Sequence, residues 1–149
     1  MTQSTSGPQG LLRGVPLFAD CNDDELAQIA ALTRARHADD GTVLVTEGEP
    51  GGDFYVIVDG RAAVSVDGGV VAELGPGSFF GEMALLDGGE RVATVTAVGP
   101  LELLTLARDD FNRMLEVAMP AIAPKLLNVV GRRVREQERR EGRGTPFGI

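Results

Sequence analysis

The sequence has very few residues that could bind a metal ion or act as a catalytic nucleophile. Cys21 is the one cysteine and His37 the one histidine among 149 residues. A single cysteine excludes an internal disulfide framework and a cysteine-rich metal site. Metal-dependent enzymes use clusters of histidine and carboxylate ligands, and a catalytic cysteine needs a histidine partner. We therefore expect no enzyme and no metal, with Cys21 structural and His37 at the surface between a helix and a strand.

We expect neither a leader nor a membrane-spanning run in this sequence. We expect no stretch that is both long and apolar enough to span a membrane. The first residues, MTQSTSGPQG, have neither the basic nor the apolar region of a signal peptide. Hydrophobic residues make up 43% of the chain, and its length suffices for one core. A cytoplasmic globular protein of one domain is the simplest expectation.

Positive charge is scarce, since the formal net charge is −8. This balance argues against a broad nucleic-acid-binding face. Residues 131–143 are the exception, with six Arg and three Glu. The run could contact a polyanion, but its interleaved acids favour a solvated amphipathic helix with internal ion pairs.

Helical patterns occupy both ends of the sequence. Residues 1–10 are predicted to form a disordered tail, and Asn22 with Glu25 resembles a capping box for a helix from about residue 23 to 34. Near the other end, prolines at positions 120 and 124 are expected to interrupt a helical stretch. The apolar face before them is formed by Phe111, Met114, Leu115 and Ala118, and the stripe after them by Leu126, Val129, Val130 and Val134.

Between these helices, short apolar runs alternate with glycines. The candidate strands are residues 43–45, 53–58, 62–66, 70–74, 91–98 and 101–106. Strands at this spacing indicate an antiparallel sandwich or barrel, and glycines supply the positive φ angles of tight turns. The predicted order is one N-terminal helix, a mainly β domain and two C-terminal helices.

The segment GSFFGEMALLDGGERVATVTA, residues 77–97, combines an acid and a base around a short apolar turn. A helix beginning near Gly81 would offer unpaired N–H groups to an anion. Glu82 can accept hydrogen bonds from sugar hydroxyls, and Arg91 offers a planar fork to phosphate oxygens. Together they describe a site for a nucleotide monophosphate. By spacing alone, the two side chains could equally pair with each other or with solvent.

This segment resembles the phosphate-binding cassette of cyclic nucleotide-binding domains, which occur in protein kinase A regulatory subunits, cyclic nucleotide-gated channels and bacterial catabolite activator proteins. EGEPGGDFYVIVDGRAAV, residues 47–64, is similar to the first hairpin of that family, and DELAQIAAL and RDDFNRML are similar to its flanking helices. The resemblance covers roughly residues 11–135. It implies an antiparallel jelly-roll β-roll with its N-terminal helix over residues 11–118, a hinge and lid helix over 119–141, and a tail over 142–149.

The resemblance also implies a role for each residue of the cassette. Glu82 would accept a hydrogen bond from the ribose 2′-hydroxyl, and Arg91 would pair with the cyclic phosphate. The backbone N–H groups near the phosphate would be those of Gly81, Met83 and Ala84, and of Val92 or Ala93. The lid helix would close over the purine with one of Leu126, Val129, Val130 and Val134.

Two positions depart from the family pattern. Val92 stands where the family has a small or hydroxyl residue, and Glu90 stands where proline is common. Val92 lacks the hydroxyl that favours guanine, so cAMP is the expected ligand and cGMP the weaker one. Glu90 adds a negative charge beside Arg91 that opposes phosphate binding. The alternative is an interaction module of the same fold with a degenerate or unused pocket.

The family's transcription factors carry a DNA-binding helix-turn-helix after the last helix, and the residues after Arg135 are too few for one. We therefore expect a stand-alone regulatory sensor without a DNA-binding domain or membrane contact. Its C-terminal helix would move on binding cAMP and act on an unidentified effector or on a second copy of the chain.

Overall fold

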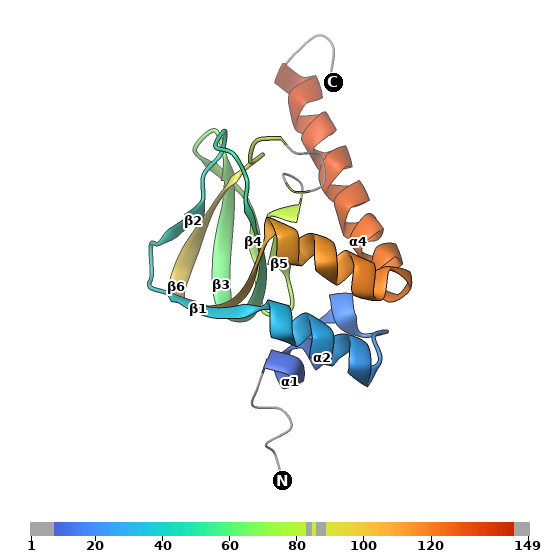
Figure 1. The fold of residues 1–149 in the computed structure, drawn as a ribbon. Coiled ribbons are helices and arrows are strands. Elements are labelled where there is room, and N and C mark those ends of the chain that lie inside the picture. The colour runs from blue at the N-terminus through green and yellow to red at the C-terminus, as the bar shows by residue number, and fades with distance from the viewer. Residues whose placement is uncertain (1–7, 83–84, 86–88, 145–149) are drawn as a thin grey trace.

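The computed structural model describes residues 8–82, 85 and 89–144 of the chain. The helices among them are α1 (Pro8–Arg13), the 3-10 helix η2 (Pro16–Phe18), α2 (Asp23–Leu32) and α4 (Arg108–Gly144). The strands are β1 (Arg34–Ala38), β2 (Val43–Val45), β3 (Asp53–Val66), β4 (Gly69–Leu74), β5 (Phe79–Phe80) and β6 (Thr94–Ala107). Figure 1 shows a β-roll with α1, α2 and the first part of α4 gathered at one end, while the second part of α4 rises along its side.

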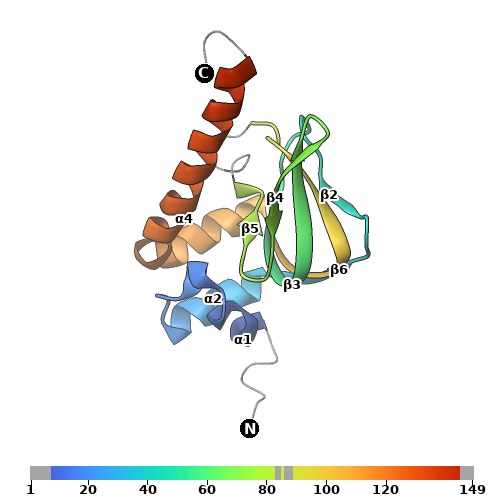
Figure 2. The ribbon, with the colours of Figure 1, turned by 180° about the vertical axis from the view of Figure 1, so that it is seen from behind.

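The strands form one antiparallel sheet in the order β1-β6-β3-β4, with β2 paired to β6 and β5 paired to β3. Mainly β structure with flanking helices is therefore confirmed. The long strands β3 and β6 form the centre of the roll, because each pairs with several neighbours, and they also pair with each other. Figure 2 shows the opposite face, where β4 and β5 lie toward α4.

Two long strands replace four predicted short ones. The runs 53–58 and 62–66 form the single strand β3, which continues through Gly60 at φ +92°. Its register against β6 shifts between Ile57 and Asp59 and again between Asp59 and Arg61. A side chain at Gly60 would place its Cβ 2.3 Å from the Pro100 carbonyl oxygen, so glycine is required by this close approach. Residues 101–106 and most of 91–98 likewise join in β6. The strands β1 and β5 were not among the predicted ones.

The N-terminal helix has the predicted cap but stops earlier than expected. The Asn22 side chain accepts a hydrogen bond from the Glu25 N–H at 2.8 Å, and the Glu25 carboxylate accepts one from the Asn22 N–H at 2.8 Å. The helix α2 ends at Leu32, and Arg34 already belongs to β1. The prediction of a disordered tail is wrong for residues 8–10, which lie in α1, and residues 1–7 lie outside the described residues.

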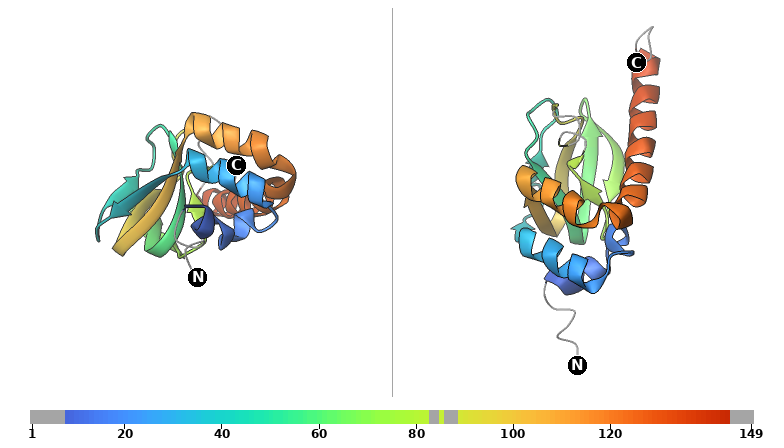
Figure 3. Two further views of the ribbon diagram at one scale, coloured as in Figure 1. Left: turned by 60° about the horizontal axis from the view of Figure 1, so that its bottom comes forward. Right: turned by 45° about the vertical axis from the view of Figure 1, so that its right-hand side comes forward.

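The interior contains two clusters of buried side chains. One lies between the helices and the roll around Phe54, whose ring centroid is 5.5 Å from that of Phe79 and 4.9 Å from that of Phe111. The other fills the roll, where Tyr55 stacks on Phe80 at 4.7 Å. Figure 3 shows the helices α1, α2 and α4 over one end of the roll, and the first cluster lies between these helices and the roll.

The helix α4 bends at one residue, which divides it into two segments. Ala118 has non-helical angles, φ −137° and ψ 29°, while Pro120 and Pro124 both lie inside the helix. The helix was predicted to be interrupted at the two prolines, and that prediction is wrong, because the interruption lies at Ala118. Pro120 falls in the first turn of the second segment, where a missing N–H costs little. Pro124 removes one intrahelical hydrogen bond without ending the helix.

One helix of the described residues is long and apolar enough to cross a membrane. An 18-residue window within Arg108–Glu136 of α4 reaches a mean hydropathy of 1.3. The expectation that no stretch would qualify is therefore wrong. Phe111, Met114 and Ile122 of this helix are fully buried in the core. Core helices of water-soluble proteins pass the same test, so the finding is weak evidence for a membrane span.

Candidate functional site

A cavity of about 130 Å³ opens between the roll and the second segment of α4. Its polar side chains are those of Glu82, Arg91, Arg133 and Glu136. Its other lining residues are Val45, Val64, Val71, Ala72, Leu74, Phe80, Gly81, Val92, Ala93 and Val95. Residues from both ends of the segment 77–97 therefore meet here with residues of the C-terminal helix.

Arg91 is held in place by the backbone. Its Nη1 donates to the Gly81 carbonyl at 3.2 Å and its Nη2 to the Asp53 carbonyl at 3.0 Å, and the residue is only 8% exposed. A guanidinium has five N–H donors, so three remain for a ligand. Burial lowers the pKa of Arg91, and the neighbouring Tyr55 and Asp53 oppose that shift. The group stays charged because its ordinary pKa is so high.

Gly81 permits this arrangement because it has no side chain. Its φ is +96°, and a Cβ there would lie 2.5 Å from the Asp53 carbonyl oxygen and 2.9 Å from Nη1 of Arg91. Any other residue would thus push against the strand and against the guanidinium.

Glu82 is a buried carboxylate with one oxygen satisfied and one open. The residue is 1% exposed, and its Oε2 accepts a hydrogen bond from Nη1 of Arg133 at 2.6 Å. Its Oε1 has no hydrogen-bond partner among the described residues. A buried acceptor without a donor is costly, so this oxygen is suited to receive a donor from a ligand.

Arg133 fixes the second segment of α4 to the roll. Besides Glu82, it donates from Nη2 to the Phe79 carbonyl at 2.7 Å, and its Cζ lies 5.1 Å from the centre of the Phe79 ring. A guanidinium over an aromatic face adds a cation–π attraction. The ion pair with Glu82 joins a side chain that is 27% exposed to one that is 1% exposed, so it is far better shielded than a surface pair.

The structure brings most of the predicted cassette together. Gly81, Glu82, Arg91, Val92 and Ala93 all line the cavity, whereas Met83 and Ala84 lie outside the described residues. Glu82 and Arg91 do not form an ion pair with each other, because each has other partners.

The four predicted lid residues do not line the cavity. Leu126, Val129 and Val130 instead pack with the cluster beneath the helices, and Val134 is half-buried outside the cavity lining. The apolar stripe of α4 faces that cluster, so its charged side is turned to the cavity. Arg133 and Glu136 were missed because they belong to the run that was interpreted as solvated, and spacing alone gives no signal for them.

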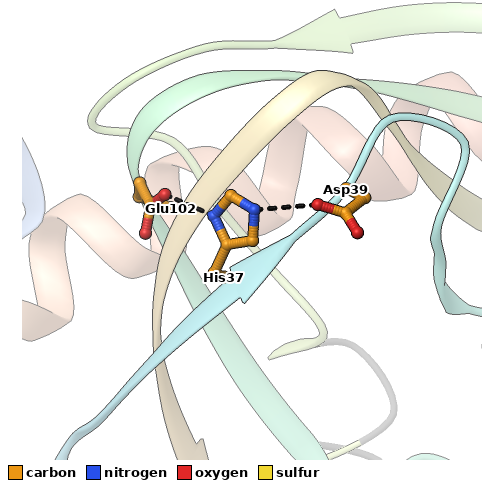
Figure 4. Close-up of polar contacts among 3 residues, drawn as sticks. All are labelled: His37, Asp39 and Glu102. Carbon is orange, nitrogen blue, oxygen red and sulfur yellow. Dashed lines mark hydrogen bonds and ion pairs between the residues drawn. The ribbon is translucent and has the colours of Figure 1, made fainter.

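A second polar cluster lies elsewhere on the roll. His37 lies in β1, not between a helix and a strand as predicted, although it is exposed as expected. Its Nδ1 lies 2.5 Å from Oε2 of Glu102 and its Nε2 lies 3.0 Å from Oδ1 of Asp39 (Figure 4). These hydrogen bonds, that to Glu102 first, raise the pKa of His37. Among the residues that the structure describes, no group of three or more His, Cys, Asp or Glu could hold a metal ion.

Comparison with known proteins agrees with this geometry. The model of the cyclic nucleotide-binding domain family matches residues 35–117. A cAMP-dependent protein kinase regulatory subunit of Yarrowia lipolytica is 41% identical over 115 residues, which cover 76% of this chain and 31% of that protein. The chain thus spans about a third of this relative's length.

Solved structures show the same fold. The regulatory domain of Toxoplasma gondii protein kinase A, crystallised with cAMP, superposes with a TM-score of 0.73 at 25% identity, over 91% of this chain and 51% of that one. The catabolite activator protein of Thermus thermophilus gives a TM-score of 0.70 at 34% identity, over 81% of this chain and 59% of that one.

Proposed function

Because the chain belongs to the cyclic nucleotide-binding domain family, we propose that it is a regulatory sensor that binds cAMP, with cGMP the weaker ligand. The observation that carries the proposal is Oε1 of Glu82, a buried acceptor that lines the cavity and has no partner among the described residues. The ribose 2′-hydroxyl of the nucleotide is the donor that would satisfy it. The cAMP in the Toxoplasma gondii structure supports this choice of ligand.

The phosphate end of the ligand is assigned to Arg91. Its two backbone hydrogen bonds orient the guanidinium and leave three donors for phosphate oxygens. The backbone N–H groups of Gly81 and of Val92 or Ala93 would add further donors, and the resemblance assigns Met83 and Ala84 the same role. Because Arg91 is held before a ligand arrives, little side-chain entropy is lost on binding.

We assign the conformational response to bound cAMP to the second segment of α4. Arg133 uses Oε2 of Glu82 and leaves Oε1 to the ligand, so nucleotide and helix can hold the same carboxylate at once. A ligand shifts a helix only by binding one of its positions better. We propose that cAMP favours the docked position of α4, and that an effector protein or a second copy of the chain senses this.

A catalytic role is not part of the proposal. The Yarrowia lipolytica relative is named as a regulatory subunit, and the described residues that line the cavity include two carboxylates and two arginines but no histidine or cysteine. No metal or other cofactor is proposed.

The second candidate is an interaction module of the same fold with an unused pocket. The observations that favour it are Glu90 and Val92 beside Arg91 and the contact of Arg133 with the carboxylate that a ribose would need. In that case Arg133 and Glu82 would serve only to fix α4 on the roll.

Calorimetric titration with cAMP, cGMP and AMP separates the two candidates. The sensor should bind cAMP with the highest affinity and AMP much more weakly, because the freely rotating phosphate of AMP loses more conformational entropy when it is held against Arg91. Absence of cAMP binding would leave the interaction module. Co-purification with and without cAMP would then show whether a partner depends on the ligand.

A further inference from the structure

A second cavity, of about 540 Å³, adjoins the one described above, and we call it the groove. Ala72, Leu74, Arg133 and Glu136 line both cavities. The groove lies between the second segment of α4 on one side and residues of η2, β4 and β5 on the other, and Figure 2 shows β4 and β5 on the side of the roll toward α4. Its volume is that of a site for a small molecule. The contacts proposed for ribose and phosphate leave it unused.

The floor of the groove is apolar. Leu17 and Phe79 are almost fully buried, and Val129 packs against the same core cluster. All three line the groove, and Pro16 and Leu74 complete its apolar lining. An apolar group that covers this floor removes apolar surface from water, which is favourable.

The helix α4 places a row of hydrogen-bond donors along the groove. Lys125, Asn128 and Arg132 follow one another at spacings of three and four residues, so they lie on one face of the helix, and all three line the groove. Lys125 is paired with Asp20 at 2.8 Å. The side chains of Asn128 and Arg132 are exposed and have no hydrogen-bond or ion-pair partner among the described residues. Two unused donors therefore stand beside an apolar floor.

The charge along this row favours an anion. Arg132 is a cation without a counter-ion among the described residues. Glu136 is the one acid among the described residues that line the groove, and it lies one turn beyond Arg132, on the side away from Asn128. An anionic group between Asn128 and Arg132 would accept hydrogen bonds from both the amide and the guanidinium, and its separation from Glu136 would limit repulsion.

We infer that the groove is a second ligand site, for a small molecule that carries one anionic group, a carboxylate, sulfonate or phosphate, on an apolar body. The anionic group contacts Asn128 and Arg132 of α4, and the apolar body covers Leu17 and Phe79. A bound molecule touches the helix and the opposite wall at once, so it stabilises the docked position of α4. The site is independent of cAMP, because it uses none of the residues assigned to ribose and phosphate.

The test compares two fluorescent probes, 8-anilinonaphthalene-1-sulfonate and N-phenyl-1-naphthylamine, which is the same molecule without the sulfonate. Both gain fluorescence when they leave water, and the wild type should bind the sulfonate more tightly. Arg132→Ala should lower this preference about three- to tenfold, the range of one partly exposed charged hydrogen bond. Arg132→Lys should retain part of the preference, because the charge remains while the planar fork is lost.

Arg135→Ala is the matched control. It removes the same charge from an exposed position of α4 that lines neither cavity, so it should leave the preference nearly unchanged. Because Arg132 lines the groove and not the first cavity, a preference that falls only in Arg132→Ala places the probe in the groove. An unchanged ratio of the two affinities in Arg132→Ala, an equal fall in Arg135→Ala, or no preference for the sulfonate in the wild type would overturn the inference.

A consequence for cAMP rests on the proposed function. If both ligands stabilise the docked helix, a saturating concentration of the sulfonate probe should tighten the binding of cAMP to the wild type, and cAMP should tighten the binding of the probe by the same factor. Mutual displacement would place the probe in the first cavity and overturn the second site, and unchanged affinities would overturn its effect on the helix. If cAMP does not bind the wild type, the proposed function is wrong, whereas the two-probe ratio with Arg132→Ala still decides whether the groove is a ligand site.

Discussion

Glu82 has two chemically equal oxygens in unequal surroundings. Oε2 holds the guanidinium of Arg133, and Oε1 is buried without a donor among the described residues. Removal of a buried partner of a charged hydrogen bond costs about 1.5–3 kcal/mol. The carboxylate can therefore contribute strongly to ligand affinity and at the same time report the position of α4.

We predict that Glu82→Ala weakens binding of cAMP by about tenfold to a hundredfold, since about 1.4 kcal/mol is tenfold. Binding of 2′-deoxy-cAMP should hardly change, because that ligand has no hydroxyl for the carboxylate. Calorimetry of both nucleotides with wild-type protein and with Glu82→Ala gives the four affinities of a thermodynamic cycle, from which the coupling between Glu82 and the 2′-hydroxyl follows. Equal losses for the two ligands would show that Glu82 does not contact the ribose hydroxyl.

Arg91→Ala should weaken cAMP binding by about tenfold to more than a hundredfold, because a charged partner of the phosphate is lost. The same change removes the bonds to Gly81 and Asp53, so a thermal melt must accompany the titration. Arg91→Lys is the matched variant: it keeps the charge but loses the planar fork, and its affinity should be intermediate. Unchanged affinity for cAMP in a folded Arg91→Ala variant would show that Arg91 does not contact the phosphate.

Val92 is expected to set the preference between the two natural ligands. It lines the cavity beside Arg91 and offers no hydroxyl. Val92→Thr adds a hydroxyl in a side chain of similar volume. We therefore expect the difference in affinity between cAMP and cGMP, measured in a competition assay, to become smaller. A wild-type protein that already prefers cGMP would contradict this assignment of position 92.

At the scale of elements, the helix α4 is held by buried apolar side chains along its first part and by one shielded ion pair, Arg133 with Glu82, further on. Its first segment is anchored by Phe111 and Met114, which are fully buried, and the bend at Ala118 precedes the second segment. Beyond Leu126, the buried fraction falls and Arg133 supplies the shielded polar contact to the roll. The residues of α4 beyond Leu126 therefore contribute less to the buried core than the residues before them.

We predict that saturating cAMP raises hydrogen-exchange protection over residues 120–136, because the ligand favours the docked helix. Arg133→Ala should reduce this effect, since it removes the bonds to Glu82 and Phe79. Arg132→Ala changes an exposed neighbour without those contacts and serves as the control. Unchanged protection of the wild type with cAMP would show that α4 is not the switch.

The elements that the sequence predicts are those that local chemistry determines. The cap at Asn22 and the strand at 43–45 follow from short-range patterns. The meeting of Glu82 with Arg91 in one cavity was predicted from the family resemblance of the segment 77–97, because spacing alone left it open. The strands β1 and β5 show no alternation of buried and exposed residues, because the first four residues of β1 are exposed and β5 has only two residues. They are strands because β1 pairs with β6 and β5 pairs with β3. The approach of Arg133 to Glu82 spans 51 positions and depends on the bend at Ala118, which no local pattern places.

At the scale of the whole molecule, the exposed edge strand β1 is joined to β6 by its backbone ladder and by one polar cluster. His37 of β1 contacts Glu102 of β6, and Asp39 flanks its other nitrogen (Figure 4). Both carboxylates attract the protonated imidazole, so the charged form of His37 favours this pairing. The pH dependence of this contact is simple to measure, because the chain has only one histidine.

The pKa of His37 is raised in the folded state by its hydrogen bonds to Glu102 and Asp39. A raised pKa means that the folded chain binds the proton more tightly than the unfolded chain does. The stabilisation is therefore complete below about pH 6.5, the ordinary value for histidine, and it is lost as the pH rises through the folded pKa. We predict that the melting temperature of the wild type exceeds that of His37→Gln at about pH 6, and that this difference shrinks at higher pH. The histidine NMR titration should give a midpoint above that of a model peptide. A midpoint at or below the peptide value, or a difference in melting temperature that does not depend on pH, would contradict the prediction.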